Sequence, residues 1–379
     1  MDRRTVITGL ALSPIAAAVS TVPAQAAARP ATPAVTVRRS KPGSAGTLVI
    51  GHRGASGYRP EHTLASYELA ARLGADFMEP DVVITKDGVL ICRHEPEIGG
   101  TTDVASHPEF ADRRVTKQLD GVAVTGWWAE DFTLAELNTL RAVERLPAIR
   151  QENTLYDGRF GIPTLQQVLD LRKDLSRRLG RDIGVYPETK HPTYFQRAGL
   201  PLEARLLGLL RRNGLNRGDA PIIVQSFETK NLQQLRDLGL RTRVVQLFGA
   251  SGAPYDLASS GDPRTYADLA TPEGLRRIAR YGDGIGPDKS LVIPRRADGS
   301  LGSPTHLVDD AHSVGLVVHP YTFRAENTFL PTDLRRGTTD SDFGRAIDEQ
   351  VAFLRAGIDG LFTDQSDIGV IARSDAAAA

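Results

Sequence analysis

Carboxylates occur close together near the ends of two predicted strands. Glu79 and Asp81 lie two residues apart in MEPDVV, and Glu188 lies two residues before Lys190 in YPETK. Because alternate strand residues point to the same face, we expect each pair to share one face of its strand. Three carboxylates within hydrogen-bonding range resist ionising together, and a divalent cation between them removes that difficulty. Oxygen ligands without cysteine select Ca²⁺ or Mg²⁺ over Zn²⁺.

Two histidines lie in charged turns close to these strands. His52 and Arg53 end a predicted strand in GHRGASGYRPEHTL, and His94 follows the turn TKDG in LICRHEPE. Hydrolysis of a phosphodiester needs a base for the nucleophile and an acid for the leaving alkoxide, and imidazole, with a pKa of ~6.5, can serve as either. We therefore interpret His52 and His94 as an acid/base pair. Five other histidines lack such surroundings and are interpreted as core or surface residues, namely His62, His107, His191, His306 and His312.

The charges of this group also fit a phosphodiester. The three carboxylates are offset by one divalent cation, Arg53 and Lys190, which leaves a net charge of +1 for an ester that carries one negative charge. Glu61 is assigned to an ion pair that orients Arg53. The simpler alternative is a set of ion pairs, in which Arg53 pairs with a carboxylate of MEPDVV and Lys190 pairs with Glu188.

Strands and helices alternate in the order that would bring these residues together. The strand-like runs are mostly continuous Val/Ile/Leu stretches, which is typical of parallel strands covered on both faces. Helical patterns follow at 64–75, 164–180, 202–215, 229–240 and 343–358. The strands are expected at 48–54, 76–83, 183–190, 221–227, 242–249, 282–289, 315–323 and 358–364.

Eight such units predict an α/β fold, a (β/α)8 TIM barrel with an insertion after strand 2, in which the charged strand ends meet at one mouth. An open doubly wound sheet is the second alternative, but the G-x-G-x-x-G turn that would support it is missing. Pro80 and Pro187, beside the charged pairs, predict that the strand ladder breaks at the mouth. Long interruptions at 97–161 and 250–270 are expected to rise from the same face.

Composition excludes several classes of protein. Lys+Arg and Asp+Glu both number 46 among 379 residues, so the formal net charge is zero. A dedicated nucleic-acid binder usually shows a basic excess, and none is present. Cys92 is the single cysteine, which rules out an intramolecular disulfide and a cysteine-based zinc site.

The N-terminus resembles an export signal. Arg3 and Arg4 precede an Ala-rich apolar stretch, and Ala24-Gln25-Ala26 suits a signal peptidase. We expect a signal peptide at 1–26, read by the twin-arginine or the general export machinery, a disordered lead-in at 27–46, and one phosphodiesterase domain at 47–373. No later run reaches the ~18 apolar residues of a spanning helix. A periplasmic or extracellular protein without stable membrane insertion is therefore expected.

An ordered series of motifs resembles the glycerophosphodiester phosphodiesterase family, in its exported bacterial branch. The series runs from HRGASGYRPEHTL through MEPDVVITKDGVLICRHEPEI, AEDFTLAEL, IPTLQQVL, YPETK, VQSF and HPYTFR to LFTDQSD. The resemblance implies a (β/α)8 barrel, one divalent cation with Ca²⁺ ahead of Mg²⁺, and a small-molecule substrate that is cleaved to sn-glycerol 3-phosphate and an alcohol. It implies metal ligands at Glu79, Asp81 and Glu188, an acid/base pair at His52 and His94, and phosphate contacts from Arg53 and Lys190.

Two departures and several weaker candidates accompany this resemblance. Many relatives carry Asn after the Glu of the PE-x-T turn, where this chain has His62, and Asp after the second catalytic histidine, where this chain has Glu95. Further substrate contacts are assigned to Glu61, Gln225, Phe227 and His319. The alternatives are a phospholipase D-like or C-like hydrolase acting on (lyso)phospholipids, a non-catalytic binding protein, and a sugar isomerase on the same fold.

Overall fold

The computed structural model describes residues 46–378. The predicted export signal, and the predicted lead-in except for its last residue, lie outside the described residues. Within residues 46–378, no helix combines the length and the apolar character that crossing a bilayer requires.

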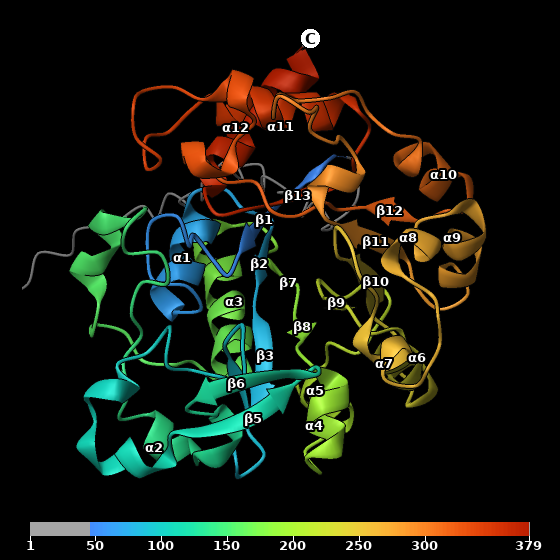
Figure 1. Ribbon diagram of the computed structural model, residues 1–379. Coiled ribbons are helices and arrows are strands. Elements are labelled where there is room, and N and C mark those ends of the chain that lie inside the picture. The colour runs from blue at the N-terminus through green and yellow to red at the C-terminus, as the bar shows by residue number, and fades with distance from the viewer. Residues whose placement is uncertain (1–45, 379) are drawn as a thin grey trace, which may run out of the picture. The chain divides into compact units, whose positions relative to one another are not determined.

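Eight parallel strands form a closed barrel within the described part of the chain (Figure 1). They are β1 (Leu48–His52), β2 (Phe77–Glu79) with β3 (Asp81–Ile84), β7 (Gly184–Val185) with β8 (Glu188–Thr189), β9 (Ile223–Ser226), β10 (Arg243–Phe248), β11 (Gly284–Pro287), β12 (Val317–Val318) and β13 (Gly360–Thr363). Each strand pairs with the next one along the chain. Phe323, just after β12, pairs with Thr363 of β13, and β13 pairs with β1, so the sheet closes. The predicted (β/α)8 architecture is confirmed.

Prolines interrupt two of these strands, as the sequence predicts, but the ladder resumes beyond them. Pro80 separates β2 from β3, and Pro187 lies between β7 and β8. A proline has no N–H to donate, yet its carbonyl can accept. The carbonyl of Pro80 accepts from the amide of Glu188 at 2.9 Å, and Asp81 then pairs with Glu188. The interruption therefore lies among the acidic residues and leaves their strands in register.

Apolar side chains fill the barrel and the layer around it. Leu48, Ile50 and Phe362 belong to the cluster inside the barrel, whereas Val49 faces outward and packs on helix α12 (Ser366–Ala378). A Cβ atom at Gly369 would lie 2.9 Å from the side chain of Val49, so glycine permits this close packing. The other helices are α1 (Leu64–Arg72), α2 (Leu134–Leu137), α3 (Leu165–Leu179), α4 (Pro192–Arg197), α5 (Glu203–Arg212), α6 (Thr229–Asp237), α7 (Tyr255–Ala258), α8 (Tyr266–Leu269), α9 (Pro272–Ile278), α10 (Leu307–Ser313) and α11 (Ala346–Arg355).

The long segment between the second barrel strand and α3 contains its own small elements. Strand β4 (Leu90–Cys92) returns antiparallel to β3, and β5 (Val115–Leu119) with β6 (Val122–Gly126) forms a hairpin. The hairpin turn reaches the start of α4, where Asp120 contacts His191 at 2.7 Å (Figure 1). Trp128 is fully buried in this segment. Residues 250–270, the second predicted interruption, contain α7 and α8.

Candidate active site

A pocket of about 490 Å³ lies at the carboxyl ends of the barrel strands. It brings together every residue that the sequence predicted for metal binding and acid/base chemistry, although these residues are spread over more than 130 positions of the chain. Its lining includes His52, Arg53, Glu79, Asp81, His94, Glu188, Gln225 and Phe227.

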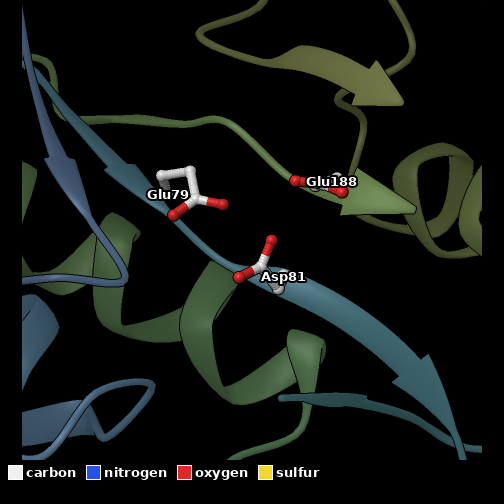
Figure 2. Close-up of side chains that lie close together, drawn as sticks. All are labelled: Glu79, Asp81 and Glu188. Atoms are coloured by element: carbon white, nitrogen blue, oxygen red, sulfur yellow. The ribbon is translucent and has the colours of Figure 1, made fainter. Parts of the chain in front are cut away.

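The three predicted metal ligands converge in this pocket (Figure 2). Glu79, Asp81 and Glu188 each offer one carboxylate oxygen, and these atoms lie within 4.8 Å of one another. Burial, with repulsion from Asp81 and Glu188, raises the pKa of Glu79 well above its usual value. Burial also raises the pKa of Glu188 to about 8, even though Lys190 lies beside it. The protein alone therefore does not keep all three carboxylates ionised.

Ion pairs account for part of this charge. Arg53 Nε lies 3.3 Å from Asp81 Oδ2, and Lys190 Nζ lies 2.8 Å from Glu188 Oε1, so both pairings of the simpler alternative exist. Among the described residues, Glu79 has no cationic side chain as a partner and accepts the backbone N–H of Arg53 at 2.7 Å. Gln225 Oε1, which belongs to a pocket residue, is buried without a hydrogen-bond partner. A hard divalent cation fits this set of oxygen donors.

Arg53 is held between two carboxylates by the turn that follows β1. Its Nη1 donates to Glu61 Oε2 at 2.9 Å, as the sequence predicted, while its Nε faces Asp81. Arg53 and His62 both adopt left-handed backbone conformations, with φ of 58° and 54°. Such a conformation costs a non-glycine residue about 1–2 kcal/mol, and side-chain and backbone bonds to acidic groups offset that cost here.

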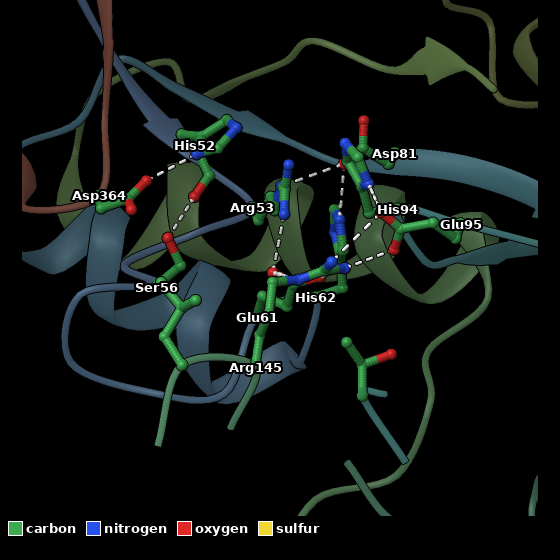
Figure 3. A network of polar contacts seen from close by, with 12 residues as sticks. His52, Arg53, Ser56, Glu61, His62, Asp81, His94, Glu95, Arg145 and Asp364 are labelled. Atoms are coloured by element: carbon green, nitrogen blue, oxygen red, sulfur yellow. Dashed lines mark hydrogen bonds and ion pairs between the residues drawn. The ribbon is translucent and has the colours of Figure 1, made fainter. Parts of the chain in front are cut away.

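The two predicted catalytic histidines share one arrangement (Figure 3). His52 Nδ1 contacts Asp364 Oδ1 at 2.6 Å, and His94 Nδ1 contacts Glu95 Oε1. The pKa of Asp364 and that of Glu95 both lie below their usual values, because arginines and the imidazoles outweigh the effect of burial. An ionised carboxylate only accepts hydrogen bonds, so each Nδ1 must carry the proton.

The remaining nitrogen, Nε2, is then a proton acceptor in both residues. His94 Nε2 lies 3.3 Å from Lys190 Nζ, and an ammonium only donates, which agrees with this tautomer. Burial and the nearby Arg53 lower the pKa of His52 to about 4. Burial, Arg53 and Lys190 lower the pKa of His94 to about 3. Both imidazoles are therefore neutral near pH 7 in the protein without ligands.

The weaker sequence candidates divide into pocket residues and buried supports. Gln225 and Phe227 line the pocket, as predicted. Glu61 and Lys190 do not line it: Glu61 pairs with arginines, and the Lys190 ammonium faces Glu188 and His94. The assignment of His319 to substrate contact is wrong, because this residue is 1% exposed inside the barrel, where Tyr186 Oη lies 3.1 Å from its Nδ1. The amide of His319 still donates to the carbonyl of Ile285 in β11 at 2.9 Å, so His319 remains among the barrel side chains.

The five histidines interpreted as core or surface residues lie outside the pocket lining. His107, His191 and His312 form partly exposed pairs with acidic residues. His62 is fully buried and supports the site: its Nε2 contacts Asp81 Oδ2 at 2.9 Å, and its Nδ1 contacts Tyr67 Oη at 2.7 Å. This residue thus orients a candidate metal ligand from behind.

Sequence reasoning missed most of the residues behind the histidines. Asp364 directly follows β13 in LFTDQSD, so its place at a strand end was the one available signal. Arg145 and Arg150 come from the long segment after β4, where no periodic pattern places a side chain. Arg145 contacts Glu95, and Arg150 contacts Asp364.

Known proteins resemble this chain in sequence and in fold. Residues 52–368 match the model of the "Glycerophosphoryl diester phosphodiesterase family". A glycerophosphodiester phosphodiesterase of Arabidopsis thaliana is 35% identical over 327 residues, which cover 83% of this chain and 82% of that protein. The Haemophilus influenzae enzyme of the same name is 27% identical and covers 85% of this chain and 88% of its own length.

Solved structures give the same result for the fold. A phosphodiesterase of Oleispira antarctica, solved in complex with the product sn-glycerol-3-phosphate, has a TM-score of 0.56 at 19% identity, covering 86% of this chain and 96% of that one. A glycerophosphodiester phosphodiesterase of Agrobacterium tumefaciens has a TM-score of 0.51 at 19% identity, covering 86% and 99%. The chain belongs to the glycerophosphoryl diester phosphodiesterase family.

Proposed function

We propose that this protein hydrolyses glycerophosphodiesters to sn-glycerol 3-phosphate and an alcohol, with His52 and His94 as the acid/base pair. The names of its relatives and the product bound to the Oleispira antarctica enzyme support the substrate class. The observation that carries the proposal is the pocket itself. It combines three buried carboxylates with two imidazoles whose Nδ1 atoms are already engaged by acidic side chains.

Glu79, Asp81 and Glu188 would hold one divalent cation. When bound, this ion supplies Lewis-acid stabilisation of charge on the phosphoryl oxygens. Ca²⁺ is proposed ahead of Mg²⁺, because Mg²⁺ usually keeps several waters and takes one or two carboxylates, whereas Ca²⁺ accepts more protein oxygens. Ionised ligands are needed for this role, and two of the three carboxylates have raised pKa values without a cation.

The side chains of the pocket divide the remaining work. Nε2 of one neutral imidazole accepts the proton of the nucleophile, which is either water or a hydroxyl group of the substrate glycerol. In the second case water must then open the cyclic phosphodiester that forms. The other imidazole must be protonated at Nε2 before it can donate to the leaving alkoxide, and an anionic ester beside it favours that state by raising its pKa. Arg53 lines the pocket and contributes a fixed positive charge for the phosphate. Lys190 lies between Glu188 and Nε2 of His94, and its positive charge disfavours protonation of that nitrogen.

Action on intact phospholipids would need an apolar landing surface near the pocket. The aromatic residues at 127–132, which could contribute to one, are used to pack the long segment itself. Trp128 and Phe132 are fully buried, and Trp127 Nε1 donates to the carbonyl of Phe110 at 2.7 Å. The hydrolysis of water-soluble glycerophosphodiesters is the better supported function.

The test is a coupled glycerol 3-phosphate assay on glycerophosphocholine with chelator, Ca²⁺ or Mg²⁺. Chelation should abolish the reaction, and Ca²⁺ should restore it better than Mg²⁺. His52→Ala and His94→Ala should fold and lose at least ~10² in rate. Full activity after exhaustive chelation, or in either histidine variant, would overturn the proposed mechanism.

Export is also proposed, supported by Arg3, Arg4 and the Ala24-Gln25-Ala26 site. N-terminal sequencing of protein recovered outside the cytoplasm should begin at Ala27. Retention of residues 1–26 in that material would contradict a cleaved signal.

A further inference from the structure

Two arginines of the long segment after β4 lie directly behind the proposed acid/base pair. They belong to residues 144–153, which we call the arginine segment. Arg145 Nη2 donates to Glu61 Oε1 at 2.7 Å and to Glu95 Oε2 at 2.6 Å (Figure 3). Arg150 Nη2 donates to Asp364 Oδ2 at 2.5 Å, and its Nε donates to Glu326 Oε1 at 2.6 Å. The two arginines thus contact the two carboxylates that engage the histidines.

Both histidines are held by the same series of contacts, in which an arginine binds a carboxylate and the carboxylate binds Nδ1 of the histidine. In one chain, Arg150 holds Asp364, and Asp364 holds Nδ1 of His52. In the other chain, Arg145 holds Glu95, and Glu95 holds Nδ1 of His94. Two independent catalytic groups therefore depend on side chains that lie five residues apart on one segment.

The ion pairs of the two clusters show what each segment arginine contributes. Each cluster contains two carboxylates and two guanidinium groups, one guanidinium from a barrel loop and one from the arginine segment. Their members are Glu61, Glu95, Arg53 and Arg145 in one cluster, and Asp364, Glu326, Arg324 and Arg150 in the other. Removal of either segment arginine leaves a carboxylate without a cationic partner. Because such a charge is unfavourable away from water, the carboxylate is expected to move towards another cation or the solvent.

The arginine segment is itself fixed to the turn that carries His52. Arg150 Nη1 and Asn153 Nδ2 both donate to the carbonyl of Ser56, at 3.0 and 3.1 Å, and the Ser56 hydroxyl donates to the carbonyl of His52 at 2.8 Å. Asn153 also donates to Glu144 at 2.9 Å, which closes the segment on itself. A cavity of about 10 Å³, lined by both segment arginines, is the space left between them. That is room for about one water molecule.

We infer that Arg145 and Arg150 are positioning residues, which fix the orientation and tautomer of His94 and His52 through Glu95 and Asp364. The inference rests on the proposed function for the role of the histidines. It goes beyond that function because it makes the inserted segment part of the catalytic apparatus. The rival explanation is that these ion pairs only attach the insertion to the barrel.

Kinetics of Arg145→Gln separate the two explanations, because Arg145 is partly exposed and its loss should be tolerated by the fold. We expect kcat to fall about 10–100-fold, as for other groups that orient a functional side chain, with KM changed less than about threefold. Arg145→Lys should recover part of the loss. In a Glu95→Gln background, Arg145→Gln should cost less than about threefold more, because residues that act through one another are not additive. Arg141→Gln is the matched control: the side chain of this arginine, in the same insertion, donates to the backbone carbonyls of Asn138 and Leu140, so its loss should leave kcat unchanged.

Histidine tautomers provide a readout that needs neither metal nor activity. In ¹⁵N-histidine spectra of the metal-free protein at pH 7.5, His52 and His94 should each show a single Nδ1–H tautomer, with signals assigned through His52→Gln and His94→Gln. Arg145→Gln should give mixed tautomers at His94 and leave His52 unchanged. Arg150→Lys should have the reverse effect, and if that variant does not fold, the Arg145 result decides alone.

The outcomes distinguish failure of this inference from failure of the proposed function. Unchanged tautomers and unchanged kcat in Arg145→Gln would overturn the positioning role, even if His94→Ala is inactive. A drop in melting temperature without either change would favour simple attachment of the insertion. Full activity of His94→Ala would instead refute the proposed function, while the tautomer spectra would still report on positioning.

Discussion

The protein neutralises two groups of carboxylates differently, one group behind the histidines and the other in the pocket. Behind the histidines, each acidic side chain contacts at least one arginine. In the pocket, the three acidic side chains share fewer cations, and Glu79 has no cationic side-chain partner among the described residues. The first group consists of Glu61, Glu95, Asp364 and Glu326, and the second of Glu79, Asp81 and Glu188.

The pKa values follow this difference. Arginines lower the pKa of Glu61 and of Asp364 well below their usual values, although burial opposes ionisation in both. In the pocket, burial and mutual repulsion raise the pKa of Glu79 and Glu188. Glu61 and Asp364 therefore stay anionic, whereas Glu79 and Glu188, at similar burial, hold protons that a cation must displace. The pKa of Asp81, the third pocket carboxylate, is lowered. Carboxylates whose charge is compensated by arginines can position catalytic groups. Carboxylates with too few cationic side chains can instead bind an external cation.

The largest predicted effect, a loss of kcat, comes from replacing the Asp364 carboxylate, which is paired with arginines, by an amide of the same shape. Asp364→Asn can offer its amide N–H to Nδ1 of His52, which would place the imidazole proton on Nε2 and remove the acceptor. A wrong tautomer of this kind costs about 10⁴ in kcat in a Ser-His-Asp enzyme, and we expect a similar loss here. Steady-state kinetics with added Ca²⁺ measure it.

The matched control for Asp364→Asn is the same substitution three residues later, at Asp367. Asp367 accepts from Tyr58 Oη at 2.9 Å and contacts no histidine within residues 46–378, so Asp367→Asn should retain nearly full kcat. A loss below about tenfold in Asp364→Asn would show that the carboxylate does not set the tautomer of His52.

The second prediction concerns what the arginine–carboxylate pairs behind His52 contribute to the stability of the protein. Arg150 is 6% exposed and compensates Asp364 and Glu326, so Arg150→Met leaves buried negative charge. Removing one partner of a buried pair costs about 3–5 kcal/mol of unfolding free energy, measurable by urea denaturation. Adding Glu326→Gln should recover part of the cost. A change below about 1 kcal/mol in the single variant would mean that Arg324 alone neutralises the cluster.

The two groups also differ in how far the sequence could predict them. The pocket carboxylates follow from strand periodicity, because Glu79 and Asp81 share a face and parallel strands place Glu188 at the same barrel end. The barrel itself followed from eight alternating units. His52 and His94 followed from their charged turns, and Glu61 was correctly paired with Arg53.

The arginine cluster could not be predicted because its members meet across loops. Arg145 and Glu61 are 84 residues apart, and Arg150 and Asp364 are 214 residues apart. No periodicity governs the conformation of residues 144–153, so nothing local indicates where these side chains point. The error at His319 has a related origin, because a short strand end does not show from sequence whether a side chain lies in the mouth or one layer below it.

The third prediction concerns the pocket carboxylates and the pH dependence of metal binding. At pH 7 the proton on Glu188 competes with a cation, because the pKa of this carboxyl is raised to about 8. The apparent metal affinity should therefore fall as the pH is lowered below about 8, by about tenfold per pH unit for each proton displaced. Calorimetry in two buffers of different ionisation enthalpy should show proton release on Ca²⁺ binding. Affinity independent of pH between 6 and 8 would mean that the carboxylates are already ionised.

The smallest predicted effect tests whether burial, rather than pairing itself, gives the arginine–carboxylate contacts their weight. On α1, Arg72 Nη2 lies 2.7 Å from Glu68 Oε1, an (i, i+4) pair with side chains 50% and 34% exposed. Water solvates both groups whether or not they pair, so a double-mutant cycle of Arg72→Gln with Glu68→Gln should give about 0.3–0.5 kcal/mol. Molar salt should remove most of that coupling, because exposed charges are screened. The cycle of Arg150→Met with Glu326→Gln should retain its coupling under the same salt. If the exposed pair matched the buried one in strength, the distance between the charges, and not their removal from water, would determine what such contacts contribute.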